Sequence, residues 1–562
     1  MRTSLALAAL AALAACGSPG HSPATPDGPP ASIDAPVDRC TAPTGTFHDQ
    51  VLPLGDGLEN RYYWLHVPDS YDCGAPMPLL VDFHGTASDT PEEAYQTPAI
   101  TALGDQVGAI VVRPRSRSSD EGGQQVYRWD QNPGDIARNV TYADNLVAYL
   151  EQHYAIDPQR VYASGFSSGS NMAAQFLADA HSPFHGLAPI AGGFWETFTP
   201  PPLASGPRIY MSTGYRDYLW PTARDLIDAM TAAGLPADHL FVQHTGGGHD
   251  LYPWHFTELW QWLDGGVAPG GGGAIAEPWT ATTLPSPADV NALALDGTTL
   301  VAAGAHGRTW RHGAAGWALD LDRGDADYTA LCFGPATALV GGDYRAAFGT
   351  ATAWSPGGGV PDYGMLGEGW VNAATCRGDG SVAVAGYWSA AVTANAGAAW
   401  TQLHAPTPYG VDAQMAGAAT STSGTTVLVG YFDYVARAGA SDTTATAIDH
   451  PAAGDWWNAV AVAGSTFWVV GDDGGILASQ DDGMTWTAQH SGTTENLYAV
   501  SFADALHGAA VGRRGTVVVT ADGGATWTPR PLGEDVYLGA VYVDATTVWI
   551  AGAGGLVATS PR

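Results

Sequence analysis

A short apolar phrase recurs through the second half of the chain, and no other feature limits the possible folds as strongly. Each copy begins a β-rich run, and the seven copies begin 38 to 45 residues apart, at Val290, Tyr328, Val371, Ala416, Trp457, Leu497 and Leu538. A period near 40 residues with several short strands per unit is typical of propeller blades. Residues 275–562 are therefore predicted to form an all-β, seven-bladed β-propeller. We expect the segment EPWTATTLP, from Glu277, to complete the seventh blade and close the ring.

Three of the repeats share a second motif, S/T-x-D-x-G-x-x-W, at Thr393–Trp400, Ser479–Trp486 and Thr520–Trp527, with Asn395 replacing the Asp in the first. Such a motif suits a hairpin in which the Asp caps turn amides, the Gly takes a positive φ and the Trp packs between blades. It resembles the Asp-box of sialidase-like and photosystem-assembly-factor propellers. The arginine cluster and the Tyr/Glu pair of an active sialidase are not recognised in this sequence. The propeller is therefore expected to serve as a binding module or a spacer rather than as a glycosidase. Its binding partner is not indicated.

The chain changes character at a glycine-rich run, residues 265–274, which is flexible enough to be a linker. Before it, short β-rich runs such as PLLVDF and GAIVVRP alternate with helical patterns such as YADNLVAYLEQHY. This alternation is typical of βα units on a buried parallel sheet. The sequence therefore predicts an α/β domain over residues 41–264, ahead of the propeller.

The charge of the chain excludes two classes of partner. Its 22 basic residues are all arginine and face 55 acidic residues, which gives a formal net charge of −33. Such a field repels nucleic acid and anionic membrane surfaces. A solvated acidic surface that keeps the protein in solution is the simplest interpretation.

Residues 1–16 combine one arginine with an apolar run that is too short to span a bilayer, and they end in Leu13-Ala14-Ala15-Cys16. This segment is predicted to be an export signal. Its ending resembles a bacterial lipobox, which implies lipidation of Cys16; an ordinary cleaved signal peptide is the alternative. Residues 17–40 are rich in Pro, Gly, Ser and Ala and are expected to be a tether. We expect the protein to be exported. It would then be either anchored to the cell envelope by lipid alone, with the outer membrane or surface favoured, or extracellular.

Four further cysteines fall into two neighbouring pairs. Pairing by neighbourhood would join Cys40 to Cys73 and Cys332 to Cys376, although four cysteines allow three connectivities. Neither C-x-x-C nor H-E-x-x-H spacing occurs. The sequence therefore predicts no metal site, and no cofactor is expected.

A single G-x-S-x-G in residues 41–264, from Gly165 to Gly169, places Ser167 between the β-rich run RVYASGF and the plausible helix NMAAQFLADA. In an α/β-hydrolase the nucleophile sits on such a strand–turn–helix, and the acid and the base follow in the order Asp, His. Asp217 ends the strand-like run RIYMSTGYRD, and His249 lies on a glycine-rich loop after the last strand. We predict Ser167 as nucleophile, His249 as base and Asp217 as the acid that orients His249.

Other residues compete for two of these roles. Asp225 and Asp250 are alternative acids, but only Asp217 directly follows a strand at the expected place. His244 competes with His249, yet it lies within the strand-like run HLFVQH and is expected to pack there.

The strand PLLVDF is followed by His84, Gly85 and Thr86, where such folds supply one backbone amide of the oxyanion hole. We assign that amide to Thr86 and the second to Ser168, while His84 is expected to order the turn. An aromatic platform for an acyl group, a sugar or a polymer is predicted from Trp129, Trp195, Trp220 and Trp254, near the predicted loops.

These motifs, GFSSG, the HG turn, the GYRD turn and GGGH, occur in an order that resembles the polyhydroxybutyrate depolymerase and feruloyl or acetylxylan esterase family of secreted α/β-hydrolases, over residues 45–264. Members commonly read HGC and GGGHxWP. Here Thr86 replaces the Cys, and DLY separates His249 from Pro253-Trp254. The first change keeps the backbone amide, whereas the second reshapes the pocket rim, so the acyl group and the alcohol of the substrate do not carry over from the family.

The resemblance implies a serine carboxylic ester hydrolase that works through an acyl-enzyme on polymer-derived or polysaccharide-linked esters. Two alternatives remain. One is a serine peptidase, because prolyl-oligopeptidase-like enzymes also join a propeller to this fold, although there the propeller usually precedes the hydrolase. The other is a non-catalytic surface binding protein.

Overall fold

A computed structural model describes residues 38–562 apart from 53–60, 89–97, 122–123, 130–132, 180, 194–198, 271–272, 325–326, 335–337, 343–344, 351–352, 357–370, 387–388, 408–411 and 452–455. The predicted signal segment, which includes Cys16, and most of the predicted tether thus lie outside the described residues. The chain divides into two compact units. One holds most of the residues up to Pro269 and the other Gly270–Arg562, with the short segment His244–Gly248 assigned to the second unit.

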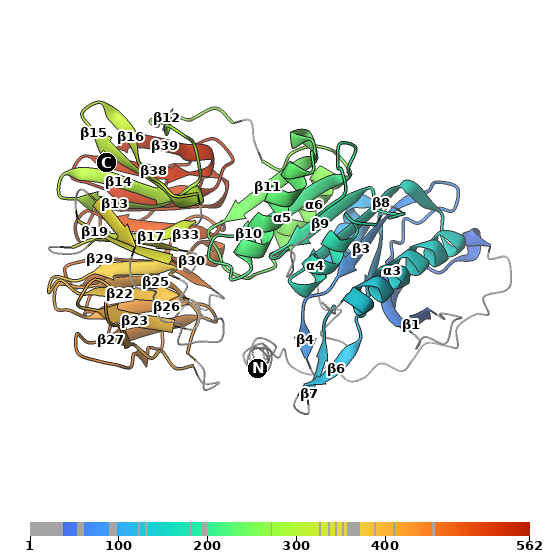
Figure 1. Cartoon of the computed structure of the whole chain (residues 1–562), viewed down its shortest axis with the longest axis horizontal. Helices are drawn as coiled ribbons and strands as arrows, with labels where there is room; N and C mark the ends of the chain where they lie inside the picture. Colours follow the sequence, from blue (N-terminus) through green and yellow to red (C-terminus); the bar gives the residue numbers. More distant parts are fainter. Residues whose placement is uncertain are drawn as a thin grey trace. The chain divides into compact units, whose positions relative to one another are not determined.

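The first unit is built on an eight-stranded sheet (Figure 1). Its strands, in spatial order, are β1 (Gly45–Leu52), β2 (Arg61–Val67), β5 (Ile110–Pro114), β3 (Met77–Phe83), β8 (Ile156–Phe166), β9 (Gly186–Ile190), β10 (Arg208–Gly214) and β11 (Leu240–Thr245). The neighbours from β5 to β10 pair in parallel, whereas β1 with β2 and β2 with β5 pair antiparallel. A small second sheet holds β4 (Ala87–Ser88), β7 (Gln124–Tyr127) and β6 (Ser118–Glu121).

Five helices accompany the large sheet within the described residues: α2 (Pro98–Val107), α3 (Pro133–His153), α4 (Ser168–Gln175), α5 (Trp220–Ala232) and α6 (Pro253–Leu263). Helices α2 and α6 contact each other, as do α3 and α4, which lie in front of the sheet in Figure 1. Of the helices in the described ranges, none has the length and apolar character needed to cross a membrane. The predicted α/β architecture of this half is thus present.

The parallel strands are buried because helices cover them. Leu79, Leu80 and Val81 of β3 are fully buried, so the strand is apolar on both faces rather than alternating. Leu80 belongs to a core cluster with residues of α2 and α6, among them Ile100 and Phe256. The run of consecutive apolar residues in the sequence is the direct result of this two-sided burial.

Both predicted disulfides are present in the structure. Cys40 joins Cys73 in the first unit, and Cys332 joins Cys376 in the second. The second bridge links the first strands of two neighbouring sheets of the propeller.

The second unit contains, among the described residues, seven four-stranded antiparallel sheets. Four of them are β13 (Val290–Asp296), β14 (Thr299–Gly304), β15 (Arg308–Gly313), β16 (Gly316–Asp322); β17 (Tyr328–Phe333), β18 (Ala338–Gly342), β19 (Arg345–Thr350), β20 (Ala353–Pro356); β21 (Ala373–Cys376), β22 (Val382–Gly386), β23 (Ser389–Thr393), β24 (Thr401–Gln402); and β25 (Met415–Thr420), β26 (Thr426–Gly430), β27 (Tyr434–Ala438), β28 (Thr446–Ala447). The other three are β29 (Trp457–Ala463), β30 (Thr466–Gly471), β31 (Gly475–Ser479), β32 (Thr487–His490); β33 (Leu497–Phe502), β34 (Gly508–Gly512), β35 (Val517–Thr520), β36 (Thr528–Pro529); and β37 (Leu538–Val543), β38 (Thr547–Gly552), β39 (Leu556–Pro561), β12 (Thr280–Thr283).

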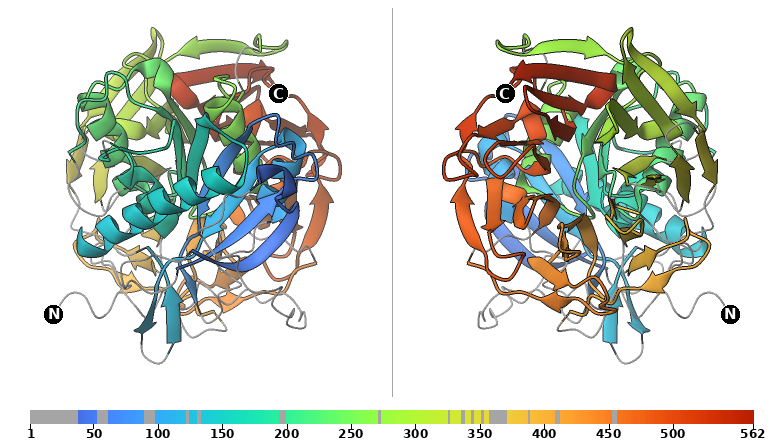
Figure 2. Two further views of the ribbon diagram at one scale, coloured as in Figure 1. Left: turned by 90° about the vertical axis from the view of Figure 1, so that its right-hand side faces the viewer. Right: turned by 90° about the vertical axis from the view of Figure 1, so that its left-hand side faces the viewer.

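These sheets form a closed β-propeller. The first strand of each sheet contacts the first strand of the next, and β37 contacts β13. In the last sheet β12 pairs antiparallel with β39, with Thr280 opposite Thr559 and Thr283 opposite Leu556. Both views of Figure 2 show the green strand β12 beside the red strands of this sheet. The segment from Glu277 therefore completes the last sheet, as predicted.

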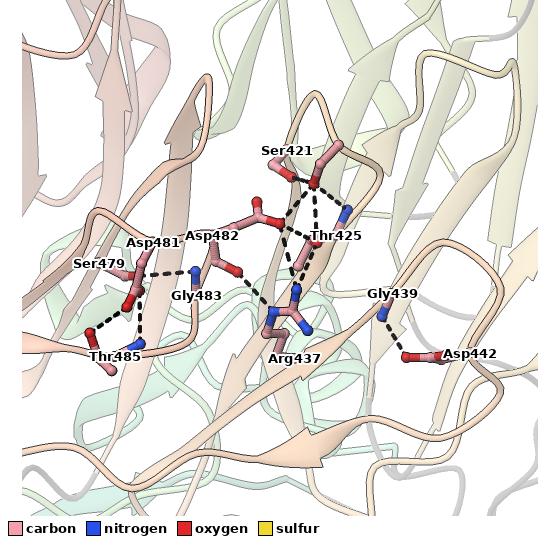
Figure 3. Close-up of polar contacts among 11 residues, drawn as sticks. Ser421, Thr425, Arg437, Gly439, Asp442, Ser479, Asp481, Asp482, Gly483 and Thr485 are labelled. Carbon is pink, nitrogen blue, oxygen red and sulfur yellow. Dashed lines mark hydrogen bonds and ion pairs between the residues drawn. The ribbon is translucent and has the colours of Figure 1, made fainter.

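The Asp-box hairpins are held by hydrogen bonds within each hairpin (Figure 3). Asp481 Oδ1 accepts the Thr485 N–H at 2.8 Å, and the Gly483 N–H donates to Ser479 Oγ at 3.0 Å. The hydroxyl and amide of Thr485 lower the pKa of Asp481 to about 2. Gly483 has φ +82°, the conformation that the motif requires.

The hairpins also join neighbouring sheets. Figure 3 shows Asp482 reaching β27, where the Arg437 Nε–H donates to the Asp482 carbonyl at 2.8 Å. Trp486 is buried in a cluster with Val427 of the adjacent sheet. In the variant motif, Asn395 Oδ1 accepts the Ala399 N–H at 2.8 Å, so the Asn performs the capping expected of the Asp. The predicted structural role of this motif is confirmed.

Candidate active site

Ser167 occupies a sharp turn between β8 and α4. Its φ of +56° and ψ of −117° lie in a region that non-glycine residues rarely adopt. The two flanking glycines explain how the turn fits. A Cβ on Gly165 would lie 2.2 Å from the Gly169 carbonyl oxygen, and one on Gly169 would lie 1.9 Å from that of Phe83. The G-x-S-x-G spacing therefore follows from close packing of backbone around the serine.

Ser167, His249 and Asp217 form one hydrogen-bonded line. Ser167 Oγ lies 2.8 Å from His249 Nε2, and His249 Nδ1 lies 3.0 Å from both carboxylate oxygens of Asp217. A carboxylate only accepts, so Nδ1 carries the proton and Nε2 faces the serine hydroxyl as an acceptor. Asp217 is fully buried, while Ser167 and His249 are 7% and 9% exposed. The residues that the sequence separated by up to 82 positions thus meet in one place.

The backbone around Asp217 holds its carboxylate in position. Asp217 Oδ1 also accepts the Leu219 N–H at 2.8 Å, and the Asp217 N–H donates to the Gly214 carbonyl. Of the competing acids, the Asp225 side chain is 76% exposed beside Arg224, and Asp250 accepts the Leu251 N–H. His244 lies within β11, as expected, and it is His249 that reaches Ser167.

Two aromatic residues that the sequence interpretation did not select enclose His249. The rings of Phe166 and Tyr218 lie 4.9 and 4.7 Å from the imidazole, centroid to centroid. Each directly neighbours a predicted triad residue in the chain, Phe166 before Ser167 and Tyr218 after Asp217. The Tyr218 hydroxyl also hydrogen-bonds to Ser167, and burial raises its pKa. Adjacency to the triad was the available signal for both.

The turn after β3 lies against the nucleophile. Thr86 follows His84 and Gly85 at the end of β3, and Ser168 is the first residue of α4. Because Gly169 abuts the carbonyl oxygens of Phe83 and His84, this turn packs directly on the start of α4. The two amides predicted for the oxyanion hole are thus on neighbouring backbone segments.

His84 fixes this turn. Its Nε2 accepts the Ser116 N–H at 3.0 Å, so Nδ1 carries the proton and donates to the Gly85 carbonyl. Burial lowers the pKa of His84 to about 3. The imidazole therefore stays neutral with both nitrogens engaged, which suits the predicted ordering role, and its low pKa makes it a poor proton acceptor near neutral pH.

A buried ion pair supports the strands beneath the turn. Arg113 Nε lies 2.9 Å from Asp82 Oδ2, with both side chains 4% exposed, and Ser164 Oγ–H donates to Asp82 Oδ1 at 2.6 Å. These contacts tie β5 and β8 to β3, which carries the oxyanion turn. Sequence reasoning missed this network, because its members belong to three separate strands.

The predicted tryptophan platform is largely wrong. Trp129 is 2% exposed and donates its indole N–H to the His84 carbonyl, so it supports the turn from inside. Trp220 is 3% exposed and packs on Tyr215. Trp254 is partly exposed at the start of α6, stacked on Tyr252, and Trp195 lies outside the described residues. Burial in the core, the usual fate of tryptophan, explains the first two.

No group of three or more His, Cys, Asp or Glu side chains in the described ranges is arranged to hold a metal ion.

Known proteins resemble the first unit. Residues 62–193 match the family model "Esterase PHB depolymerase". Poly(3-hydroxyalkanoate) depolymerase C of Paucimonas lemoignei is 33% identical over 27% of this chain and 36% of its own length. The bifunctional acetylxylan esterase/xylanase XynS20E of Neocallimastix patriciarum is 27% identical over 26% and 20%. The chain thus spans about a third or less of the length of these two relatives.

The second unit has its own relatives. Residues 486–560 match the family model "Photosynthesis system II assembly factor YCF48". The solved structure of YCF48 from Cyanidioschyzon merolae is 15% identical, with a TM-score of 0.42 over 51% of this chain and 98% of that one. The resemblance predicted from the motifs is confirmed in both halves: part of the first unit is similar to PHB depolymerase-type esterases, and part of the propeller is similar to the assembly factor YCF48.

Proposed function

We propose that this protein is a serine carboxylic ester hydrolase. The observation that carries the proposal is the line from Ser167 Oγ through His249 to Asp217, with separations of 2.8 and 3.0 Å, on a strained turn between a buried strand and a helix. The esterase-type relatives of this domain support the same reaction class.

In the first half of the proposed reaction, Ser167 Oγ attacks the ester carbonyl carbon while its proton passes to His249 Nε2. Asp217 keeps the imidazole in the required tautomer and stabilises its positive form. The amides of Thr86 and Ser168 donate to the developing oxyanion. When the C–O bond breaks, His249 returns the proton to the departing alcohol, and the acyl group remains on Ser167.

In the second half, water enters beside His249, which takes one of its protons as the oxygen attacks the acyl carbon. The intermediate collapses to the free carboxylic acid, and the proton returns through His249 to Ser167 Oγ. Within the chain, the proton passes only between Ser167 Oγ and His249 Nε2, which lie 2.8 Å apart in the structure.

We assign the substrate to polymer-derived or polysaccharide-linked esters, of the polyhydroxyalkanoate or the feruloyl and acetyl type. The names of the two relatives above motivate both classes, one a polyester depolymerase and the other an acetylxylan esterase. The propeller, which we interpret as seven-bladed, would hold the substrate or a surface partner.

Export and lipid anchoring at Cys16 are part of the same proposal, motivated by the lipobox-like ending of residues 1–16. Labelling of cells with a radioactive fatty acid tests it. Label should enter the wild-type protein and be lost in Cys16→Ala. Equal labelling of both would refute anchoring at this cysteine.

The central experiment is hydrolysis of p-nitrophenyl esters of increasing acyl length by wild type and Ser167→Ala. Turnover should fall to background in the variant, and the chain-length profile should distinguish acetyl from bulkier acyl groups. Ser70→Ala, an exposed serine of the same unit, is the matched control and should behave as wild type.

Turnover that persists in Ser167→Ala would exclude Ser167 as the nucleophile. An inactive wild type would count against ester hydrolysis. Peptide substrates would then test the serine peptidase alternative, and a lack of activity on both would favour a non-catalytic binding protein.

A further inference from the structure

The propeller carries a groove of about 390 Å³ between its last sheet and the sheet of β13–β16. Strands β12, β38 and β39 line one wall, and the β15–β16 hairpin lines the other. All of these residues belong to the second unit, so the groove is a feature of the propeller alone.

One wall presents a cross-strand row of side chains. Trp549 of β38 pairs with Thr559 of β39, which pairs with Thr280 of β12, so the three side chains share one face. Val548 and Ile550 belong to the core cluster on the opposite face. The indole N–H of Trp549 donates to Asp544 Oδ2 at 3.0 Å, which fixes the orientation of the ring.

The facing wall is aromatic. His312 and Trp317 are direct cross-strand partners in the β15–β16 pair. The His312 ring lies 5.1 Å from Trp317 and 5.0 Å from Trp549, and the two indoles are 6.3 Å apart at an angle of 82°. Both tryptophans are partly exposed, so the rings form a corner open to the groove.

The lining carries no carboxylate, guanidinium or ammonium group among the described residues. Its polar side chains are the threonines Thr280, Thr282, Thr283 and Thr559 and the imidazole of His312. The net charge of −33 disfavours an anionic ligand, and the lining offers no carboxylate to pair with a cationic one. Its chemistry suits a neutral ligand with both apolar faces and hydroxyl groups.

We propose that this groove binds a neutral polysaccharide. The apolar face of a sugar ring would pack on the indoles of Trp317 and Trp549, while its hydroxyls would exchange hydrogen bonds with the row of threonines. Binding here is independent of the ester hydrolysis proposed for Ser167, and it would keep a polymeric substrate near the enzyme.

Affinity electrophoresis tests the proposal with the full chain, because the strong negative charge drives the protein through a native gel. Protein carrying Ser167→Ala, which prevents turnover, is run in gels with increasing soluble neutral arabinoxylan, and the retardation gives a dissociation constant. Trp317→Ala and Trp549→Ala should each weaken binding about tenfold, the loss expected for a well-stacked aromatic contact. Leu506→Ala, at a 52% exposed apolar residue elsewhere on the propeller, should bind as the parent does.

A hydroxyl-deleting variant distinguishes sugar binding from adsorption to a hydrophobic polymer and does not depend on the bulk of a tryptophan. Thr559→Val keeps the side-chain shape, so it should weaken retardation by arabinoxylan several-fold. If the parent is not retarded, or if all variants are retarded equally, the proposal is wrong. It is also wrong if Thr559→Val binds arabinoxylan unchanged while poly(3-hydroxybutyrate) granules capture the protein through the same tryptophans. Activity of wild type on p-nitrophenyl esters reports separately on Ser167.

Discussion

The imidazole of His84 accepts a hydrogen bond from the Ser116 N–H at 3.0 Å through Nε2, and this contact places its single ring proton on Nδ1. That proton is donated to the Gly85 carbonyl. The Gly85 carbonyl and the Thr86 N–H belong to one planar trans peptide and point in opposite directions. A neutral histidine of fixed tautomer thus sets the direction of the amide that we assign to the oxyanion hole.

His84→Gln should therefore lower kcat for p-nitrophenyl acetate by up to about 10²–10³, the range for loss of one oxyanion donor, with a smaller change in KM. His185→Gln, an exposed histidine of the same unit, is the control. The pH at which activity is half-maximal should not move, because the lowered pKa of His84 keeps its imidazole neutral near neutral pH. Wild-type kcat in His84→Gln would show that the turn is ordered without the imidazole.

His84 should also make the free energy of unfolding depend on pH. The pKa of His84 is about 3 in the folded state, below its ordinary value of 6.5. Between pH 3 and pH 6.5, therefore, this histidine binds a proton in the unfolded chain but not in the folded chain. This contribution to stability is fully present above pH 6.5 and is lost as pH falls toward 3. Urea unfolding at pH 7 and pH 5 should show a smaller drop in unfolding free energy for His84→Gln than for wild type. An identical drop in both would mean that His84 titrates normally.

Asp217→Asn should decrease kcat by about 10³–10⁴, because the amide favours the wrong imidazole tautomer while the geometry is retained. Asp225→Asn removes an exposed carboxylate eight positions further along the chain and should have no effect. Steady-state assays with one ester substrate are sufficient for the comparison. Strong loss in Asp225→Asn with little in Asp217→Asn would reverse the assignment.

Gly169→Ala should abolish ester hydrolysis and lower the melting temperature, since its Cβ would lie 1.9 Å from the Phe83 carbonyl oxygen. Backbone, rather than a flexible side chain, would have to move. Gly74→Ala is the control, because its Cβ would meet only the Asp72 side chain at 3.4 Å. The melting temperature and the rate of ester turnover should be measured for both variants and compared with wild type. Normal activity in Gly169→Ala would show that the turn can open without cost.

The sequence was sufficient to predict the parts of the site that local patterns encode. Ser167 lies in a motif, and Asp217 and His249 follow strands in an order that the fold requires, so each could be found without coordinates. The repeat starts could be found in the same way because every propeller sheet begins with a similar strand. The Asp-box with Asn395 in place of the Asp could be recognised because the other positions of the motif are intact.

What the sequence could not reveal are contacts that depend on which strands become neighbours. Arg113 and Asp82 are 31 positions apart and meet only because β3 lies between β5 and β8. Trp129 was misassigned because a tryptophan near a predicted loop can turn inward as readily as outward. The pairing of Thr280 with Thr559 depends on ring closure, which brings together residues from opposite ends of the propeller.

That closure has a consequence for the order of events during synthesis. Strand β12 is made before every other strand of the propeller, yet its partner β39 is the last of them to leave the ribosome. Until then β12 has an unpaired edge, and the preceding sheets are an open arc. Joining residues about as distant as Thr280 and Thr559 also carries the largest loop-closure entropy in the domain. We therefore expect the propeller to close after translation, so that loss of β39 would leave the arc open and prone to aggregation through its free strand edges.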